Sequence, residues 1–250
     1  MPKSNDGPKV TLSQSVAPKG YEQVLDFLSD QLRAGALQVG DRLLPERELA
    51  AKLGISRPLV REAVRALAMI GVLEVQQGRG TFVRSPDFST LSDVFTFMFV
   101  QDGDERDDIM ELRQGIERQA IRLACLRART SDFEKIGSAL KDIYATIDDA
   151  ERGGAADFAF HTRLVEASHS AALVKVYTII SRILLSNHVV RRRRIAASGR
   201  MREYILDHHD KLFRAVQRRD VEESERLLSE HFAIGEQLTN EQLGRATETA

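Results

Sequence analysis

A change in hydrophobic period near residue 71 constrains the fold of this chain more than any other feature. Before it, three segments that start near Tyr21, Pro45 and Arg57 repeat apolar residues at helical spacing. After it, two short apolar runs at residues 72–75 and 81–83 flank QQGRG, whose glycines suit a hairpin turn. Three helices and a hairpin within about 65 residues are typical of a winged helix-turn-helix.

Signals at the ends of these segments agree with that interpretation. Gly35 and Gly40 are expected to end the first helix, and Gly54 allows a left-handed turn after the second. Ser56 is a suitable N-cap for the third helix, and Pro58 is suited to its first turn. The second and third helices are therefore predicted to be joined by a tight turn.

The rest of the chain shows helical spacing and no strand pattern. We expect breaks at Gly103, Thr130, Gly153-Gly154, Ser170, Ser198-Gly199 and Asp220. The helices between them are expected near residues 88–100, 105–128, 131–151, 154–168, 171–194, 200–218 and 221–240. The predicted protein is mostly α, with an N-terminal winged helix-turn-helix and a C-terminal all-α helical bundle of about 160 residues.

These patterns divide the chain into five parts. Residues 1–17 are predicted to be a flexible tail, and residues 18–84 a DNA-binding domain. Residues 85–104 are predicted to be a linker and a connecting helix. Residues 105–240 are predicted to form the effector-binding and dimerisation domain, followed by a tail at 241–250.

Composition narrows the class of protein. An apolar content of 42% is enough for packed cores and argues against gross disorder. The single cysteine, Cys125, excludes an intrachain disulfide and suits a reducing compartment. The N-terminal residues lack an apolar signal core, and the apolar stretch 171–185 is too short and too polar to span a bilayer. We therefore expect a soluble, cytoplasmic protein with no membrane partner.

Charge is unevenly placed along the chain. Residues 1–84 hold 12 basic and 9 acidic side chains, whereas residues 85–250 hold 24 and 28. Arg57, Arg61 and Arg65 recur every four residues and so form one cationic stripe on the third helix. An isolated stripe of this kind is more often an ordinary solvated face. Within a helix-turn-helix pattern it favours contact with DNA, because that helix enters the major groove.

The segment GDRLLPERELAAKLGISRPLVREAVRALAMIGVLEVQQGRGTFV resembles the DNA-binding domain of GntR-family transcription regulators. The resemblance runs from about Tyr21 to Val83 and implies a set of contact positions. The implied main contacts are Arg47, Arg57, Arg61 and Gly78, with the more variable neighbours Ser56, Pro58 and Gln77. Arg79 joins them at the wing tip, where a cation can enter the minor groove. A dimer of such domains implies a palindromic operator.

Four residues in the second half could hold a metal ion. Asp157 and His161 lie four apart on one helix face, and His209 and His231 are 22 residues apart on two helices that would pair. Three imidazoles and a carboxylate suit Zn, Ni, Fe or Mn. The spacing alone is a weak signal, since an inward-facing histidine is more often a satisfied core residue.

Residues 107–240 resemble the FCD effector domain of the FadR-type GntR subfamily, through IMELRQGIERQAIRLA, DFAFHTRLVEASHS and DHHDKLFRAVQRRDVEESERLLSEHF. The resemblance implies a divalent metal, first of all Zn, on Asp157, His161, His209 and His231. His208 is the rival of His209, but the run H-x-x-L-F-x-A-V starts at His209. His169 and His188 fall outside the pattern and are interpreted as structural or exposed.

The same resemblance implies a small carboxylate effector, such as a hydroxy acid or sugar acid, bound through the metal. Arg113 could neutralise a second anionic group, or it could form an ordinary surface salt bridge. The run Arg191–Arg194 is interpreted mainly as a solvated face, and the alternatives are a DNA-proximal patch and a partly ligand-facing position. The predicted function is a homodimeric, ligand-responsive transcription regulator that acts as a repressor, and not an enzyme. The alternatives are a metal-free regulator of the acyl-ligand type and, with less support, a metalloenzyme fused to a DNA-binding domain.

Overall fold

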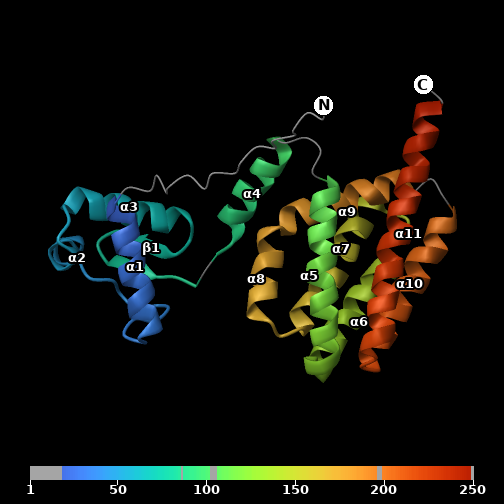
Figure 1. Cartoon of the computed structure of the whole chain (residues 1–250), viewed down its shortest axis with the longest axis horizontal. Coiled ribbons are helices and arrows are strands. Elements are labelled where there is room, and N and C mark those ends of the chain that lie inside the picture. The colour runs from blue at the N-terminus through green and yellow to red at the C-terminus, as the bar shows by residue number, and fades with distance from the viewer. Residues whose placement is uncertain (1–18, 86, 102–105, 196–198, 249–250) are drawn as a thin grey trace, which may run out of the picture. The chain divides into compact units, whose positions relative to one another are not determined.

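The computed structural model describes residues 19–85, 87–101, 106–195 and 199–248. The chain divides into two compact units, residues 1–90 and 91–250, which are described separately (Figure 1). The tail predicted at residues 1–17 and the break predicted at Gly103 lie outside the described residues.

The first unit is a three-helix domain with a hairpin. Its elements are α1 (Lys19–Arg33), α2 (Glu46–Leu53), α3 (Arg57–Met69), β1 (Leu73–Gln76) and β2 (Gly80–Val83). The strands pair antiparallel, with Leu73 opposite Val83 and Gln76 opposite Gly80. The apolar faces of the three helices meet in one core that includes Leu28, Leu49, Val60 and Leu67. The predicted winged helix-turn-helix is therefore confirmed.

The turn between α2 and α3 follows the sequence signals, with one exception. Gly54 adopts the left-handed conformation at φ +66°, and the Ile55 amide donates to the Ala50 carbonyl. Ser56 occupies the N-cap position of α3, but its side chain makes no capping hydrogen bond. The start of α3 thus depends on the extended backbone at Ser56 and on Pro58 in the first turn.

The second unit is an all-α bundle, as predicted. Its helices are α4 (Ser89–Gln101), α5 (Arg106–Arg127), α6 (Thr130–Ala145), α7 (Ala150–Ala167), α8 (Ala171–Ile179), α9 (Ser181–Ile195), α10 (Gly199–Gln217) and α11 (Val221–Glu248). Helix α7 packs against α5, α6 and α9, and α11 packs against α5 and α10 (Figure 1). Most of the core lies between these helices and includes Ile136, Phe160, Leu164 and Leu212.

The break predicted at Gly153-Gly154 is wrong, because both glycines lie inside α7. Helix α6 ends earlier, at Ala145, and the Asp149 side chain caps α7 by accepting from the Arg152 amide. The glycines serve close packing instead. A Cβ atom on Gly154 would lie 2.7 Å from the Cα atom of Val189, so α9 can cross α7 only where a side chain is missing.

Two further boundaries differ from the prediction. The helix expected at 171–194 is two helices, α8 and α9, which bend by 62° at Ile180. No single described helix is long and apolar enough to cross a membrane, and this bent pair reaches the required length and composition only when both parts are taken together. The last helix, expected at 221–240, is longer than predicted, since α11 continues to Glu248 through EQLGRATE in the predicted tail. That segment holds good helix formers and no proline, and one glycine does not end a helix.

The packing of α7 on α9 gives a direct test. We expect Gly154→Ala to lower the free energy of unfolding by about 1–3 kcal/mol, because the new methyl group overpacks the backbone of Val189. Gly115→Ala on α5 is the matched control, since a Cβ atom there has no neighbour within 4 Å among the described residues. The control should be neutral or more stable by up to about 1 kcal/mol. Urea unfolding that gives equal stabilities for the two variants would contradict this packing argument.

Candidate metal centre and DNA-binding surface

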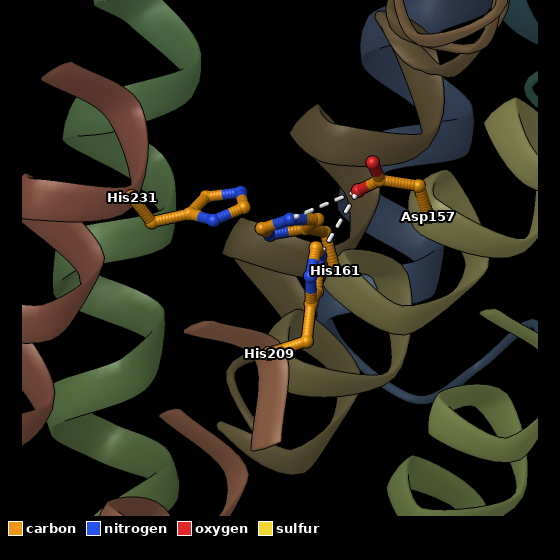
Figure 2. A group of neighbouring side chains, drawn as sticks. All are labelled: Asp157, His161, His209 and His231. Atoms are coloured by element: carbon orange, nitrogen blue, oxygen red, sulfur yellow. Dashed lines mark hydrogen bonds and ion pairs between the residues drawn. The ribbon is translucent and has the colours of Figure 1, made fainter. Parts of the chain in front are cut away.

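Three helices bring the four candidate metal ligands together. Asp157 and His161 lie one turn apart on α7, His209 lies on α10, and His231 lies on α11. A turn at Arg219 and Asp220 joins α10 to α11. The Arg219 guanidinium fixes this turn by donating to the carbonyls of Cys125, in α5, and of Ala128, just after α5. One ligand atom from each of the four residues falls within a span of 4.8 Å, and all four side chains are buried (Figure 2).

Hydrogen bonds orient each imidazole in the same sense. Nδ1 of His161 lies 2.6 Å from Glu117 Oε2, and Nδ1 of His209 lies 2.6 Å from the Ile205 carbonyl. Both acceptors lack a hydrogen, so the proton belongs on Nδ1 of each ring and Nε2 keeps its lone pair. For His231, the Tyr204 hydroxyl lies 3.3 Å from Nδ1 and donates to the His231 carbonyl. All three rings therefore present Nε2 toward the shared space (Figure 2).

The buried atoms of this cluster fit a metal ion. Nε2 of His161 and Nε2 of His231 are buried and have no hydrogen-bond partner among the described residues. A buried polar atom without a partner is costly, and a divalent cation would satisfy both nitrogens at once. Three imidazole nitrogens and one carboxylate oxygen form a donor set suited to Zn²⁺ and to other first-row transition metals.

His208, the rival of His209, lies outside the cluster. Its ring lies beside the Tyr204 ring, with centroids 4.6 Å apart and planes tilted by 46°, and is only partly buried. Burial lowers the pKa of both His209 and His231, so both rings are neutral near pH 7 as metal ligands must be.

A second layer of buried charges surrounds His161. Glu117 on α5 accepts from Nε of Arg113 at 2.6 Å and from the Tyr177 hydroxyl at 2.8 Å, both through Oε1. Burial alone would raise the pKa of Glu117, but Arg113 and His161 hold that pKa well below its usual value. Arg113 does form a salt bridge, as one interpretation expected. The salt bridge is buried and not on the surface, however, because the side chains of Arg113 and Glu117 are 1% and 2% exposed.

The two oxygens of Asp157 face different groups. Oδ1 lies 3.3–3.4 Å from nitrogens of His161, His188 and His209. Oδ2 lies 3.1 Å from Nη2 of Arg191 and 3.6 Å from Nε of Arg192. Burial would raise the pKa of Asp157, but His188, Arg191 and His209 hold it well below its usual value, so the carboxyl group is ionised.

These contacts bear on two sequence-based interpretations. Arg191 and Arg192 lie beside Asp157, so the favoured interpretation as a solvated face is wrong for these two, whereas Arg193 is exposed and pairs with Glu151. His188, interpreted as structural or exposed, is buried beside Asp157, and burial lowers its pKa to about 3. Consecutive arginines gave no signal in the sequence, because the direction of each side chain depends on how α9 lies on α7.

The proposed DNA contacts all lie on the surface of the first unit. Arg57, Pro58 and Arg61 are exposed at the start of α3, where Ser56 is also exposed. The remaining exposed positions are Arg47 on α2 and Gln77, Gly78 and Arg79 between β1 and β2. Within the described residues, neither Arg57 nor Arg61 has an ion-pair partner, so both guanidinium groups are free for an external anion.

Two family models match the chain. Residues 20–83 match "Bacterial regulatory proteins, gntR family", and residues 108–233 match "FCD domain". LutR of Bacillus subtilis, an HTH-type transcriptional regulator, is 28% identical over 74% of this chain and 85% of its own length. An Escherichia coli protein named for regulation of an L-lactate dehydrogenase operon is 29% identical over 84% of this chain and 83% of its own length.

A third relative and one solved structure agree. The Uxu operon transcriptional regulator of Escherichia coli is 28% identical over 66% of this chain and 65% of its own length. The structure of Streptococcus agalactiae GntR shares the fold, with a TM-score of 0.64 and 24% identity over 85% of this chain and 97% of that one. The named relatives are transcriptional regulators and not enzymes. The chain therefore belongs to the GntR family of bacterial transcription regulators and carries an FCD domain.

Proposed function

We propose that this ligand-responsive regulator senses a small carboxylate through a divalent metal held by Asp157, His161, His209 and His231. The observation that supports the proposal is the convergence of four buried ligand atoms within 4.8 Å, two of them imidazole nitrogens that have no hydrogen-bond partner among the described residues. Zn²⁺ is the first candidate, and Ni²⁺, Mn²⁺ and Fe²⁺ accept the same ligands. When bound, the metal would supply a Lewis-acid position for a carboxylate or hydroxy acid.

The residues around the centre would prepare it for that ion. Glu117 fixes the His161 ring, the Ile205 carbonyl fixes the His209 ring, and Tyr204 lies beside His231. Such outer hydrogen bonds commonly tune metal affinity, because they set both the tautomer and the direction of the ligand nitrogen. Arg113 is fully buried against Glu117 and its guanidinium lies 4.8 Å from the centre of the Phe232 ring, from where its charge attracts an anionic effector.

We further propose that the protein is a cytoplasmic homodimer that binds palindromic operator DNA as a repressor. The exposed arginines at the start of α3 would reach the major groove, and the tip between β1 and β2 would reach the minor groove. Two named relatives are described as regulators of the L-lactate dehydrogenase and Uxu operons, which supports a small organic acid as effector here. The effector must bind one arrangement of the DNA-binding domains better than the other, or it cannot change operator occupancy.

Metal content tests the first part of the proposal. Purified, tag-free wild-type protein should carry about one divalent ion per chain by elemental mass spectrometry, and His209→Ala should lose it. His208→Ala is the matched control, because His208 is the neighbouring histidine on the same helix and lies outside the ligand cluster. The control should keep the ion.

Equal metal content in wild type and His209→Ala would contradict the assignment. Absence of metal after reconstitution would make the four residues structural and would favour the alternative, a metal-free regulator of apolar or acyl ligands.

Operator binding tests the second part. A duplex selected by the wild-type protein from a random-sequence pool serves as the probe. Arg57→Ala should weaken binding by on the order of tenfold, because one cationic contact to a base or phosphate is lost. Loss of a phosphate contact should also lower the slope of log affinity against log salt by about 1. Arg33→Ala is the control, since Arg33 is already paired with Asp30 at 2.9 Å. Unchanged affinity and slope for Arg57→Ala would remove the assignment.

A further inference from the structure

The buried charges around the candidate metal centre do not balance. Among the described residues, three guanidiniums lie there: Arg113, Arg191 and Arg192, whose side chains are 1%, 15% and 5% exposed. Within the part of the chain that the structure describes, two carboxylates face them, those of Glu117 and Asp157, which are both 1–2% exposed. The cluster therefore holds one positive charge in excess, and a divalent metal would raise the excess to three. An uncompensated buried charge is strongly unfavourable, so this excess indicates an anion that binds here.

Two of the guanidiniums have donors left over. Nε and Nη2 of Arg192 are buried and have no hydrogen-bond partner among the described residues, and the same holds for Nη2 of Arg113. Arg113 is committed to Glu117 through Nε, but Arg192 reaches Asp157 only as an ion pair at 3.6 Å. Arg192 is therefore the buried cation whose hydrogen-bonding capacity is least used.

A recess of about 10 Å³, with room for about one water molecule, lies on the Asp157 side of the cluster. Its walls include Asp157, Arg191, Arg192, Tyr204 and His231, so two of the candidate metal ligands and the two arginines face the same space, and an acid can enter only when these walls move apart. The carboxylate of Asp157 lies between the two groups, with one oxygen toward the histidines and the other toward the arginines. The Asp157 carboxylate thus lies directly between the proposed metal position and the guanidinium groups.

We infer that the effector is an acid with at least two anionic groups, one for the metal and the other for Arg191 and Arg192. This inference rests on the proposed metal-sensing function and names its ligand class. A metal bound to Asp157 would neutralise the carboxylate charge that Arg191 and Arg192 now face. The two guanidinium groups would then lack a counter-charge, which a second anionic group of the effector could supply. The narrow spacing favours a compact acid whose two anionic groups are a few bonds apart, such as a hydroxy-dicarboxylate or a phosphorylated hydroxy acid.

Matched acid pairs test the inference by calorimetry on the zinc-loaded full chain. The pairs are lactate with malate, glycerate with 3-phosphoglycerate, and gluconate with glucarate. Within each pair one extra anionic group is added to a hydroxy-acid frame. In at least one pair the acid with the extra anionic group should bind on the order of tenfold or more tightly than its partner, the effect of one charge-assisted contact.

Arg192→Gln and Arg191→Gln should each remove most of that preference while keeping the zinc. Arg191 is partly exposed, so its substitution serves if Arg192→Gln does not fold. Arg193→Gln is the control from the same helix, because Arg193 is exposed and pairs with Glu151. The Arg193→Gln variant should keep the full preference for the acid with the extra anionic group.

Several results would overturn the inference. The first is that the acid with one anionic group binds as tightly as its partner in every pair. The second is that the zinc-loaded protein binds no acid of the panel. The third is that neither Arg191→Gln nor Arg192→Gln changes the preference. Each of these leaves the metal proposal standing, provided that zinc is retained. Failure to retain zinc in the wild type is a different outcome, since it removes the proposed function itself and the inference with it.

Discussion

The second unit is organised around the ion pairs of one buried carboxylate, that of Asp157. This carboxylate is fully buried at the centre of the bundle, with imidazoles on one oxygen and guanidiniums on the other. A buried carboxylate is tolerated only when it is paired and hydrogen-bonded, and here its partners come from α7, α9 and α10. The helices that form the apolar core are thus the same helices that supply the charges of the site.

This arrangement requires α7 and α9 to approach closely. Gly154 allows that approach, since any side chain there would meet the backbone of Val189. The close crossing places His188, Arg191 and Arg192 beside Asp157 instead of in solvent. A feature of backbone packing therefore determines which charges enter the site.

The sequence predicted some parts of this structure well. Hydrophobic period and turn residues were sufficient for the first unit, because glycines with positive φ follow its three helices, at Gly35, Gly54 and Gly71, and lie at its hairpin turn, at Gly78 and Gly80. The four candidate ligands could also be named from their spacing and the family resemblance, and the structure brings them together.

Other parts depend on contacts between distant segments. The glycines at 153 and 154 were expected to break a helix, and the capping role of Asp149 was missed, although a capping residue before a helical run is a local signal. No local pattern distinguishes Arg192, which is buried, from Arg193, which is exposed. Glu117 lies 44 residues before His161, so their pairing becomes visible only when α5 and α7 are packed.

X-ray absorption spectroscopy of the zinc-loaded protein can identify the atoms that hold the metal. We expect three imidazole nitrogens and at least one oxygen at about 2.0–2.2 Å from the metal, with no sulfur. Asp157→Ala should remove an oxygen scatterer or the metal itself. The proposed metal centre is wrong if the spectrum shows fewer than three imidazoles, or a sulfur ligand at about 2.3 Å, which only Cys125 or a methionine could supply.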